Sequence, residues 1–480
     1  MVRSLMLVVA LALVGCDRSE KIDYIVEESG RPVGTLEARL SLLDDHSSEQ
    51  EISLNARVTM RALGQKVLVT RRDELVVDTD TRQLITARRN TRWGELDVVC
   101  SLQATADSVH LTGVMENALT VPRTADMFLE DGFRFGFMLE GLKAAEPDSV
   151  FRYRGVDMER AMVVHVEVRP VGLDSLVLGG ETRPAWCFDI AYPDNHSSRR
   201  IWIDPADGLL LRNDNSDGTS LRLGGLESGE RFSPVELDSL ILAPTNVAIE
   251  DPLAIRYMKV RVEINSTGEP LTPDGLNVPG QQFTGTVEGT TIEGVFEIAH
   301  VAFDGSGAPG FPPSSSAYAD SALAPFLQSG FFIDSDDAEV KTMAVRVTAG
   351  SETCWDAARR LARWVEEEID YAIPGGGSAS GTLEMRKGEC GSHSRLMAGM
   401  CRAVGIPARM VIGGMYFNNP GPTFGQHAWT EVHMGPAGWI PLDATIGEDE
   451  VLDSGHVRLG YMSSFQPVFM EILDHRVAVD

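Results

Sequence analysis

Three short segments near the C-terminus constrain the fold of this chain more than any other feature. They read Gly388-Glu389-Cys390-Gly391, Gln426-His427-Ala428-Trp429 and Pro441-Leu442-Asp443-Ala444-Thr445. Each contains one residue of a type used in nucleophilic catalysis, namely Cys390, His427 and Asp443. If the three act together, the fold must bring the start of a helix next to two neighbouring strands.

The segment after Cys390 has the pattern of a helix. Apolar residues recur at helical spacing on one face: Leu396, Met397, Met400, Cys401 and Val404. The pattern stops at Gly405, which suits a left-handed C-terminal cap. We therefore expect Cys390 in the first helical turn, where free backbone N–H groups and the helix dipole favour a thiolate. The alternative is a buried structural cysteine, but its glycine and polar neighbours are poor core residues.

His427 and Asp443 are expected on two strands of one hairpin. Residues 428–433 alternate between two faces, a turn-rich stretch follows, and residues 439–442 resume an extended apolar run. An antiparallel pair centred on Gly435 places His427 opposite Asp443, and a register one residue different places Asp443 on the diagonal. In either register Asp443 can orient one ring nitrogen while the other faces the thiol.

Two other histidines compete for the role of base. His393 follows Cys390 by three residues and is expected on the same helical face, whereas His433 lies further along the strand of His427. We prefer His427 because it alone has an acidic partner fixed by the strand pairing.

The region 388–447 resembles the bacterial transglutaminase-like core, a papain-related fold. The matching pieces are residues 386–390, 402–409, 425–432 and 439–445, and with the preceding helix they cover about 130 of the 480 residues. The resemblance implies Cys390 as nucleophile, His427 as base and Asp443 as the orienting residue. Because the family includes transamidating enzymes, peptidases, amidases and inactive members, it does not fix the reaction.

Such a triad supports acyl transfer from an amide. Thiolate attack on the carbonyl gives an oxyanion, and the backbone N–H of Cys390 is the expected donor to it. A second donor is needed, and Gln426, Trp355 and Thr382 are candidates. Water that resolves the thioester makes a hydrolase, whereas a lysine amine makes a crosslinking enzyme.

Two segments upstream of Cys390 are expected to frame the site. Thr353 and Asp356 predict an N-cap with an acidic first turn, followed by a helix of the catalytic core. Residues 374–381 are rich in glycine and serine, and we expect no regular element there. This segment is either a mobile loop beside the cleft or a plain flexible connection.

The N-terminus predicts export. Residues 1–15 have the length of a signal peptide, and their apolar stretch is too short to span a bilayer. Leu13-Val14-Gly15-Cys16 resembles a bacterial lipobox. The resemblance implies cleavage before Cys16 and lipid attachment to it, and hence a membrane-anchored lipoprotein on the periplasmic side of the cell envelope. An ordinary cleaved signal, with Cys16 incidental, is the alternative.

Composition excludes several classes of partner and site. The chain has 42 basic and 70 acidic residues, a net charge of −28 spread along its length, which disfavours nucleic acid as a partner. Six cysteines in 480 residues do not make a disulfide scaffold. No phosphate loop or dinucleotide fingerprint is found, and Asp334-Ser335-Asp336-Asp337 lacks the spacing of a calcium loop, so an acidic turn before a helix explains it better. No metal site and no cofactor are therefore expected.

The rest of the chain is expected to be rich in strands. Residues 16–245 contain short alternating runs, such as 65–71, broken by turn residues. They resemble the half-barrel sheets of periplasmic lipoprotein-binding proteins, which implies an apolar groove. Residues 246–304 are expected as a small β region and residues 305–316, rich in Gly, Pro and Ser, as a linker to a catalytic domain at 317–480. The predicted fold class is therefore α+β, multidomain, with β-rich N-terminal domains before a transglutaminase-like (papain-like) catalytic core.

The sequence thus predicts an exported cysteine-dependent enzyme acting on peptide or isopeptide amide bonds, with a peptide or protein as substrate. Hydrolysis is the first choice because water is the default acceptor outside the cytoplasm. The alternatives are protein-glutamine transamidation and a catalytically silent envelope lipoprotein that binds a peptide or lipid.

Overall fold

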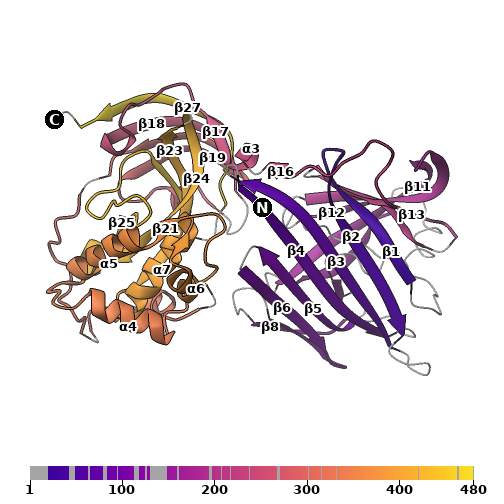
Figure 1. Cartoon of the computed structure of the whole chain (residues 1–480), viewed down its shortest axis with the longest axis horizontal. Helices are drawn as coiled ribbons and strands as arrows, with labels where there is room; N and C mark the ends of the chain where they lie inside the picture. The colour runs from indigo at the N-terminus through magenta and orange to yellow at the C-terminus, as the bar shows by residue number, and fades with distance from the viewer. Residues whose placement is uncertain are drawn as a thin grey trace. The chain divides into compact units, whose positions relative to one another are not determined.

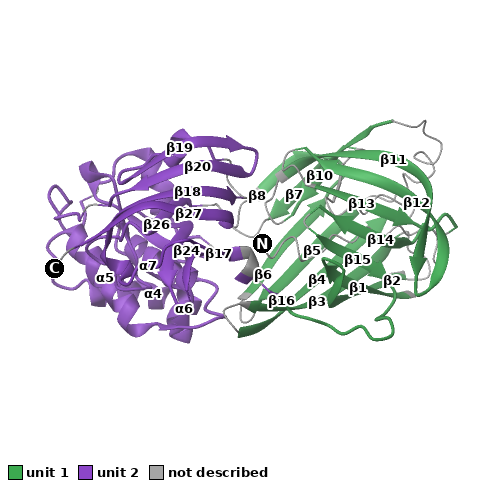
Figure 2. Cartoon of the chain, turned by 90° about the horizontal axis from the view of Figure 1, so that it is seen from above, with its two compact units in different colours: residues 1–235 green, residues 236–480 purple. Residues whose placement is uncertain are grey.

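The computed structural model describes the chain from residue 20 to residue 478, apart from residues 43–48, 63–64, 79–83, 94–95, 113–117, 125–126, 130–148, 159–161, 194–196, 207, 217, 237, 267–270, 301, 315, 331, 420 and 462–463. Cys16 and the predicted signal peptide therefore lie outside the described residues. The chain divides into two compact units, residues 1–235 and 236–480 (Figure 2). No helix within the described ranges is both long and apolar enough to cross a membrane.

The first unit is one continuous sheet built mainly from antiparallel hairpins. The strands follow one another along the chain on each side of a central pair, β1 with β15, and β9 pairs with β10 in parallel. Figure 1 shows β1 to β6 side by side in one curved layer. The strands are β1 (Glu20–Glu28), β2 (Arg31–Leu42), β3 (Glu49–Ala62), β4 (Gln65–Asp78), β5 (Leu84–Trp93), β6 (Leu96–Ala104), β7 (Ser108–Thr112), β8 (Ala118–Pro122), β9 (Met127–Leu129), β10 (Phe151–Asp157), β11 (Met162–Leu178), β12 (Glu181–Tyr192), β13 (Ser197–Ile203), β14 (Leu210–Asn215), β15 (Thr219–Leu223) and β16 (Val235–Glu236), which pairs with β3.

The buried face of this sheet is not purely apolar. Along β4, alternate residues are buried, as expected for a strand with one face covered. Two of them are Arg71 and Asp73, and the Asp73 carboxylate lies 2.6 Å from the guanidinium of Arg71 and 3.0 Å from that of Arg89. Burial raises the pKa of Asp73, but the two guanidinium groups outweigh it and hold this pKa far below its usual range. The buried face of the sheet thus carries a cluster in which one carboxylate pairs with two guanidinium groups.

The second unit contains two sheets and a group of helices. One sheet has the order β17-β24-β23-β26, with β25 also paired to β24, and the other has the order β19-β20-β18-β27. Residues 255–298, predicted as part of a separate small β region, therefore share a sheet with β27 near the C-terminus. The strands are β17 (Leu242–Pro244), β18 (Ile255–Asn265), β19 (Gln281–Glu288), β20 (Thr291–Ile298), β23 (Ala408–Asn418), β24 (Pro422–His433), β25 (Trp439–Leu442), β26 (His456–Gly460) and β27 (Gln466–Val477).

The helices of this unit pack together beside β23 and β24 (Figure 1). The longer ones are α4 (Ala338–Val347), α5 (Cys354–Glu368), α6 (Ala379–Met385) and α7 (Cys390–Ala403), and the short ones are α3 (Asp238–Ile241), η1 (Pro252–Ala254), η2 (Asp274–Leu276), η3 (Ser321–Phe326) and η4 (Gly435–Ala437). The predicted N-cap of α5 is confirmed, because the Thr353 hydroxyl accepts from the N–H of Asp356. Asp337 caps α4, as the acidic turn before a helix predicts. Buried apolar residues of α5, α7 and β24, among them Leu361, Met400 and Val432, form the core between helices and sheet.

The Gly/Pro/Ser-rich segment 305–316 is part of the second unit rather than a connection between units. Its Pro309 carbonyl accepts from the N–H of Cys354 (2.8 Å), and the N–H of Phe311 donates to the carbonyl of Glu352 (2.9 Å). Phe311 also packs against the core around α5. These two hydrogen bonds hold part of the segment's backbone against the start of α5. The division between the two compact units falls between residues 235 and 236.

The glycine-rich segment 374–381 is also more ordered than its composition predicts. The expectation of no regular element is wrong at its end, where Ser378 caps α6 by accepting from the N–H of Gly381. A side chain at Gly375 would overlap Gly388 and the hydroxyl of Ser392. The Gly376 carbonyl accepts from the Ser392 hydroxyl at 2.9 Å. This loop is therefore packed against the start of α7, where Cys390 lies.

Candidate active site

Cys390 is the first residue of α7, as predicted, and it is half-buried. The chain enters the helix through β22 (Lys387–Gly388), which pairs in parallel with β21 (Asp370–Tyr371). The helix ends at Ala403, and Gly405 adopts the predicted left-handed conformation with φ of +83°. The thiol is thus held at a helix start by a short strand pair on one side and the packed glycine loop on the other.

The N-cap of this helix is Glu389, whose importance the sequence did not reveal. Its carboxylate accepts from the N–H of Gly391 (2.5 Å) and from the guanidinium of Arg395 (3.1 Å), and the Cys390 thiol lies 3.7 Å from it. Burial raises the pKa of Glu389, but the charge of Arg395 and these hydrogen bonds bring it below its ordinary value. The thiol therefore lies beside a charged carboxylate that is itself paired with Arg395.

His427 and Asp443 come together, although not in the predicted register. The pairs Thr430↔Leu442 and His433↔Trp439 centre the hairpin on Pro436 instead of Gly435, because a 3-10 turn, η4, closes it. The direct pairing of His427 with Asp443 is therefore wrong, and extending the observed register places Asp443 diagonal to His427. The diagonal contact is close: Nε2 of His427 lies 2.5 Å from Oδ2 of Asp443.

Both members of this pair are shielded from solvent, with His427 6% and Asp443 0% exposed. Burial lowers the pKa of His427, but the charges of Asp443 and Cys390, and hydrogen bonding to both, raise it to about 10. The imidazole is therefore protonated at neutral pH. Since Nε2 faces Asp443, Nδ1 is the nitrogen left for the thiol. Burial raises the pKa of Asp443, but the positive His427 holds it far below its usual range.

The two competing histidines are placed elsewhere. His393 is 2% exposed, with Nδ1 at 3.1 Å from the Glu389 carbonyl and Nε2 at 3.0 Å from the Ile369 carbonyl. Its ring is therefore engaged with backbone oxygens and ties α7 to the end of α5. His433 packs edge-on to Trp439, six residues along β24 from His427. Neither histidine is arranged as the base.

Two of the three candidates for the second oxyanion donor have structural roles. Trp355 is buried and packs edge-on to Phe303, and the Thr382 hydroxyl donates to the Ser378 carbonyl (2.8 Å) inside α6. Gln426 is exposed, and its side-chain oxygen accepts a long 3.5 Å bond from the N–H of Phe465.

Tyr371 is a neighbour of the thiol that the sequence did not suggest. It pairs with Gly388, two residues before Cys390, and is 56% exposed. Burial of its hydroxyl raises the pKa of Tyr371, and the charges of Cys390 and Glu389 raise it further. A phenol with a raised pKa remains a hydrogen-bond donor at neutral pH. Only the parallel pairing of β21 and β22, two residues each, brings this side chain to the site, and two-residue strands have no pattern to detect.

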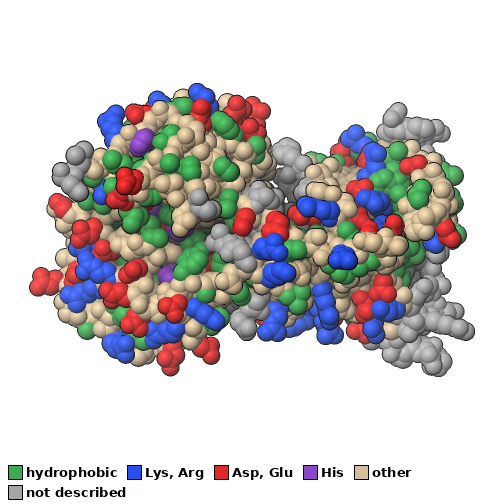
Figure 3. Space-filling view, turned by 45° about the horizontal axis from the view of Figure 1, so that its top comes forward, with side chains coloured by type: hydrophobic (Ala, Val, Ile, Leu, Met, Phe, Trp, Pro, Cys, Tyr) green, Lys and Arg blue, Asp and Glu red, His purple; other side chains and the backbone are tan. Residues whose placement is uncertain are grey.

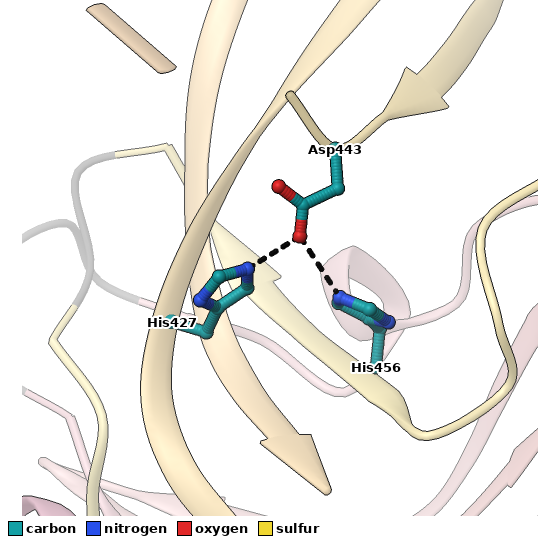
Figure 4. A group of neighbouring side chains, drawn as sticks. All are labelled: His427, Asp443 and His456. Atoms are coloured by element: carbon teal, nitrogen blue, oxygen red, sulfur yellow. Dashed lines mark hydrogen bonds and ion pairs between the residues drawn. The ribbon is translucent and has the colours of Figure 1, made fainter. Parts of the chain in front are cut away.

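A second buried histidine lies behind the pair. Nε2 of His456 is 3.4 Å from Oδ2 of Asp443, the oxygen that also faces His427 (Figure 4). Its other nitrogen, Nδ1, is 3.1 Å from the carboxylate of Asp453 and 3.9 Å from that of Glu448. No local motif marks these residues, because the bend between Asp443 and β26 folds them back onto the site.

These groups raise the question of a metal ion, which the sequence did not predict. His427, Asp443 and His456 offer ligand atoms within 4.8 Å of one another, and so do Glu448, Asp453 and His456. However, the pKa of His456 is well above its ordinary value: burial lowers it, and the carboxylates of Asp453 and Asp443 outweigh burial. Both ring nitrogens of His456 thus face carboxylates at ion-pair distance, and these residues form an ion-pair network.

The surface of the protein carries both signs of charge. Figure 3 shows acidic and basic side chains interspersed over the face that it presents. The net charge of −28 is therefore not collected into one acidic patch on that face.

One family model matches the C-terminal part of the chain. Residues 341–444 match the family model of the Transglutaminase-like superfamily, so the chain contains a transglutaminase-like domain, as the sequence motifs predict. With the β-rich first unit, this confirms the predicted fold class. No curated protein matches the chain.

Three of the similar solved structures come from different organisms. A proposed cysteine protease from Cytophaga hutchinsonii is 17% identical, with a TM-score of 0.34, over 50% of this chain and 94% of its own. A β-barrel-like protein of a domain of unknown function from Brucella abortus is 14% identical, with a TM-score of 0.32, over 44% of this chain and 96% of its own. A proposed protease from Parabacteroides distasonis is 11% identical, with a TM-score of 0.20, over 62% of this chain and 72% of its own.

Proposed function

We propose that the transglutaminase-like domain of this chain is a cysteine-dependent hydrolase of peptide or isopeptide bonds, with Cys390, His427 and Asp443 as its catalytic triad. The observation that carries the proposal is the hydrogen bond of 2.5 Å between a buried, protonated His427 and the buried Asp443, beside a thiol at a helix start. A buried imidazolium costs free energy unless it is paired, and a thiolate at Cys390 is its natural second partner.

The reaction follows from these positions. The Cys390 thiolate attacks the amide carbonyl carbon, and the carbonyl π electrons move to oxygen. When the oxyanion collapses, the C–N bond breaks and His427 protonates the leaving amine. Neutral His427 then takes a proton from water, and the resulting hydroxide attacks the thioester. Collapse releases the carboxylic acid product, whose proton is lost, and the thiolate and the imidazolium are restored.

Two donors are proposed for the oxyanion: the backbone N–H of Cys390 and the hydroxyl of Tyr371. The N–H of a first-turn residue has no partner within its helix, and Tyr371 borders the same thiol.

The Tyr371→Phe variant is expected to lose about a hundredfold in the steady-state hydrolysis of p-nitrophenyl acetate, a typical loss for one oxyanion donor. Its rate of alkylation by iodoacetamide should stay within about twofold, because alkylation forms no oxyanion. Tyr461→Phe, a change of another exposed tyrosine, is the control. Equal loss of both rates in Tyr371→Phe would show that Tyr371 shapes the thiol and is not an oxyanion donor.

The proposed site of action is outside the cytoplasm, on an envelope protein or peptide. Residues 1–15 and the lipobox-like segment ending at Cys16 support this part of the proposal. Mass spectrometry of the N-terminal peptide tests it: a diacylglyceryl group on an N-terminal Cys16 is expected, and an unmodified Cys16 would contradict anchoring.

Incubation with denatured casein and a fluorescent primary amine separates hydrolysis from transamidation. We expect new peptide N-termini by mass spectrometry with the wild type and none with Cys390→Ala. Incorporation of the amine with release of ammonia, without new N-termini, would make the enzyme a transamidase instead.

A further inference from the structure

His456 is a buried histidine for which the proposed reaction has no use. It is 0% exposed and is the first residue of β26, across β23 from the strand of His427. Its ring packs edge-on to Trp429, with 5.1 Å between centroids, and lies 5.5 Å from the ring of His427. A histidine held this way costs desolvation free energy, so its contacts must compensate.

Both ring nitrogens of His456 face carboxylates. Nε2 lies 3.4 Å from Oδ2 of Asp443, and Nδ1 lies 3.1 Å from Oδ2 of Asp453. Both contacts are ion pairs: among the described residues Nε2 makes no hydrogen bond, and Nδ1 also faces the backbone carbonyl of Asp453 at 3.3 Å. In Figure 4 the two histidines point at the same oxygen of Asp443 from different sides.

The groups around His456 carry both signs of charge. Burial, the largest cause, and neighbouring acids raise the pKa of Glu448 to about 8. The carboxyl group of Glu448 is therefore neutral at pH 7. Two carboxylates, Asp443 and Asp453, then face two cations, His427 and His456. The proposed Cys390 thiolate would add one negative charge next to His427. Glu431 on β24 is neutralised by Arg409 and Arg458. His300, after β20, has a pKa of about 4, lowered by burial and by His456, and is neutral.

We propose that His456 is a positioning residue of the active site, which clamps Asp443 between Asp453 and His427 and thereby aims His427 at Cys390. This inference rests on the proposed function of the triad. Asp443 follows the last residue of β25 and lies outside the paired residues of β24 and β25. Its Oδ1 is fixed by the N–H of Thr445 at 2.8 Å. The ion-pair contact of His456 attracts the other oxygen at 3.4 Å and opposes rotation of the carboxylate away from His427.

Two substitutions separate positioning from a merely structural role. In His456→Gln the side-chain amide nitrogen replaces Nε2 and can still donate to Asp443. In His456→Asn it replaces Nδ1 and can donate only toward Asp453. Both remove the ring and the charge, so loss of packing affects them alike.

The readout is the rate of Cys390 alkylation by iodoacetamide between pH 5 and 8, with Cys390 identified by peptide mapping. We expect His456→Asn to lose about tenfold or more at pH 5, because no N–H group then faces Asp443, while His456→Gln stays within about threefold of the wild type. Equal rates in the two variants, with equal losses of thermal stability, would overturn the proposal. So would a change in the wild-type profile after dialysis against EDTA, because a metal would then hold Asp443.

Failure of this inference can be told from failure of the proposed function. If the wild-type profile is that of an ordinary thiol, the triad itself is wrong. If the wild-type thiol is activated and neither His456 variant changes it, only the role of His456 is wrong.

Discussion

Replacing Asp443 with asparagine is expected to reduce the steady-state hydrolysis of p-nitrophenyl acetate by about ten-thousandfold, as a change of the orienting acid does in other triads. The structural reason is the tautomer of His427. Asp443 can only accept from Nε2, which leaves Nδ1 to exchange protons with the thiol. An asparagine can present its NH₂ group to Nε2, and the proton then moves to Nδ1, where it blocks the base.

Asp453→Asn is the matched control, because Asp453 faces His456 and not His427. It should lose no more than about tenfold, because Asp453 acts on Asp443 only through His456. If Asp443→Asn keeps more than a tenth of the wild-type rate while remaining folded, Asp443 does not orient the base.

Replacing Cys390 with alanine is expected to abolish both the burst of p-nitrophenol and the turnover that follows it, since the acyl group has no other acceptor in the site. Cys401→Ala is the control, because Cys401 lies on the same helix but is fully buried. Burial, the largest cause, raises the pKa of Cys401 above its usual range, so it is an unreactive thiol. Turnover in Cys390→Ala equal to that of the wild type would show that the nucleophile lies elsewhere.

The parts of the site that local patterns determine were predictable from the sequence. The start of α7 at Cys390 follows from a helical apolar face that ends at a glycine, and β25 follows from a short apolar run after turn residues. The contact of His427 with an acidic side chain followed from the argument that a neighbouring strand supplies the acid, and the structure places Asp443 against it.

The parts that tertiary packing determines were not predictable. The hairpin register depends on η4, a turn whose length the sequence did not reveal, and the shift moved Asp443 from the opposite to the diagonal position. Tyr371 and His456 reach the site through strand pairings that connect residues distant in sequence, β21 with β22 and β23 with β26. The place of β27 was not predictable for the same reason, because it pairs with β18, which lies about two hundred residues earlier in the chain.

The pH dependence of Cys390 alkylation, compared between the wild type and His427→Ala, tests the central claim most directly. With a pKa of about 10, His427 remains protonated up to that pH, so its positive charge lies beside the thiolate throughout pH 5–8. The wild-type rate should therefore change by less than about threefold between pH 5 and 8. In His427→Ala, the rate should follow a free thiol of pKa about 8.5 and fall on the order of a thousandfold over the same range.

His433→Ala, which changes another histidine of β24, should keep the wild-type profile. A wild-type rate that falls steeply below pH 8 and is unaffected by the loss of His427 would contradict a preformed imidazolium–thiolate pair. The same result would remove the basis for assigning this domain a cysteine-dependent reaction.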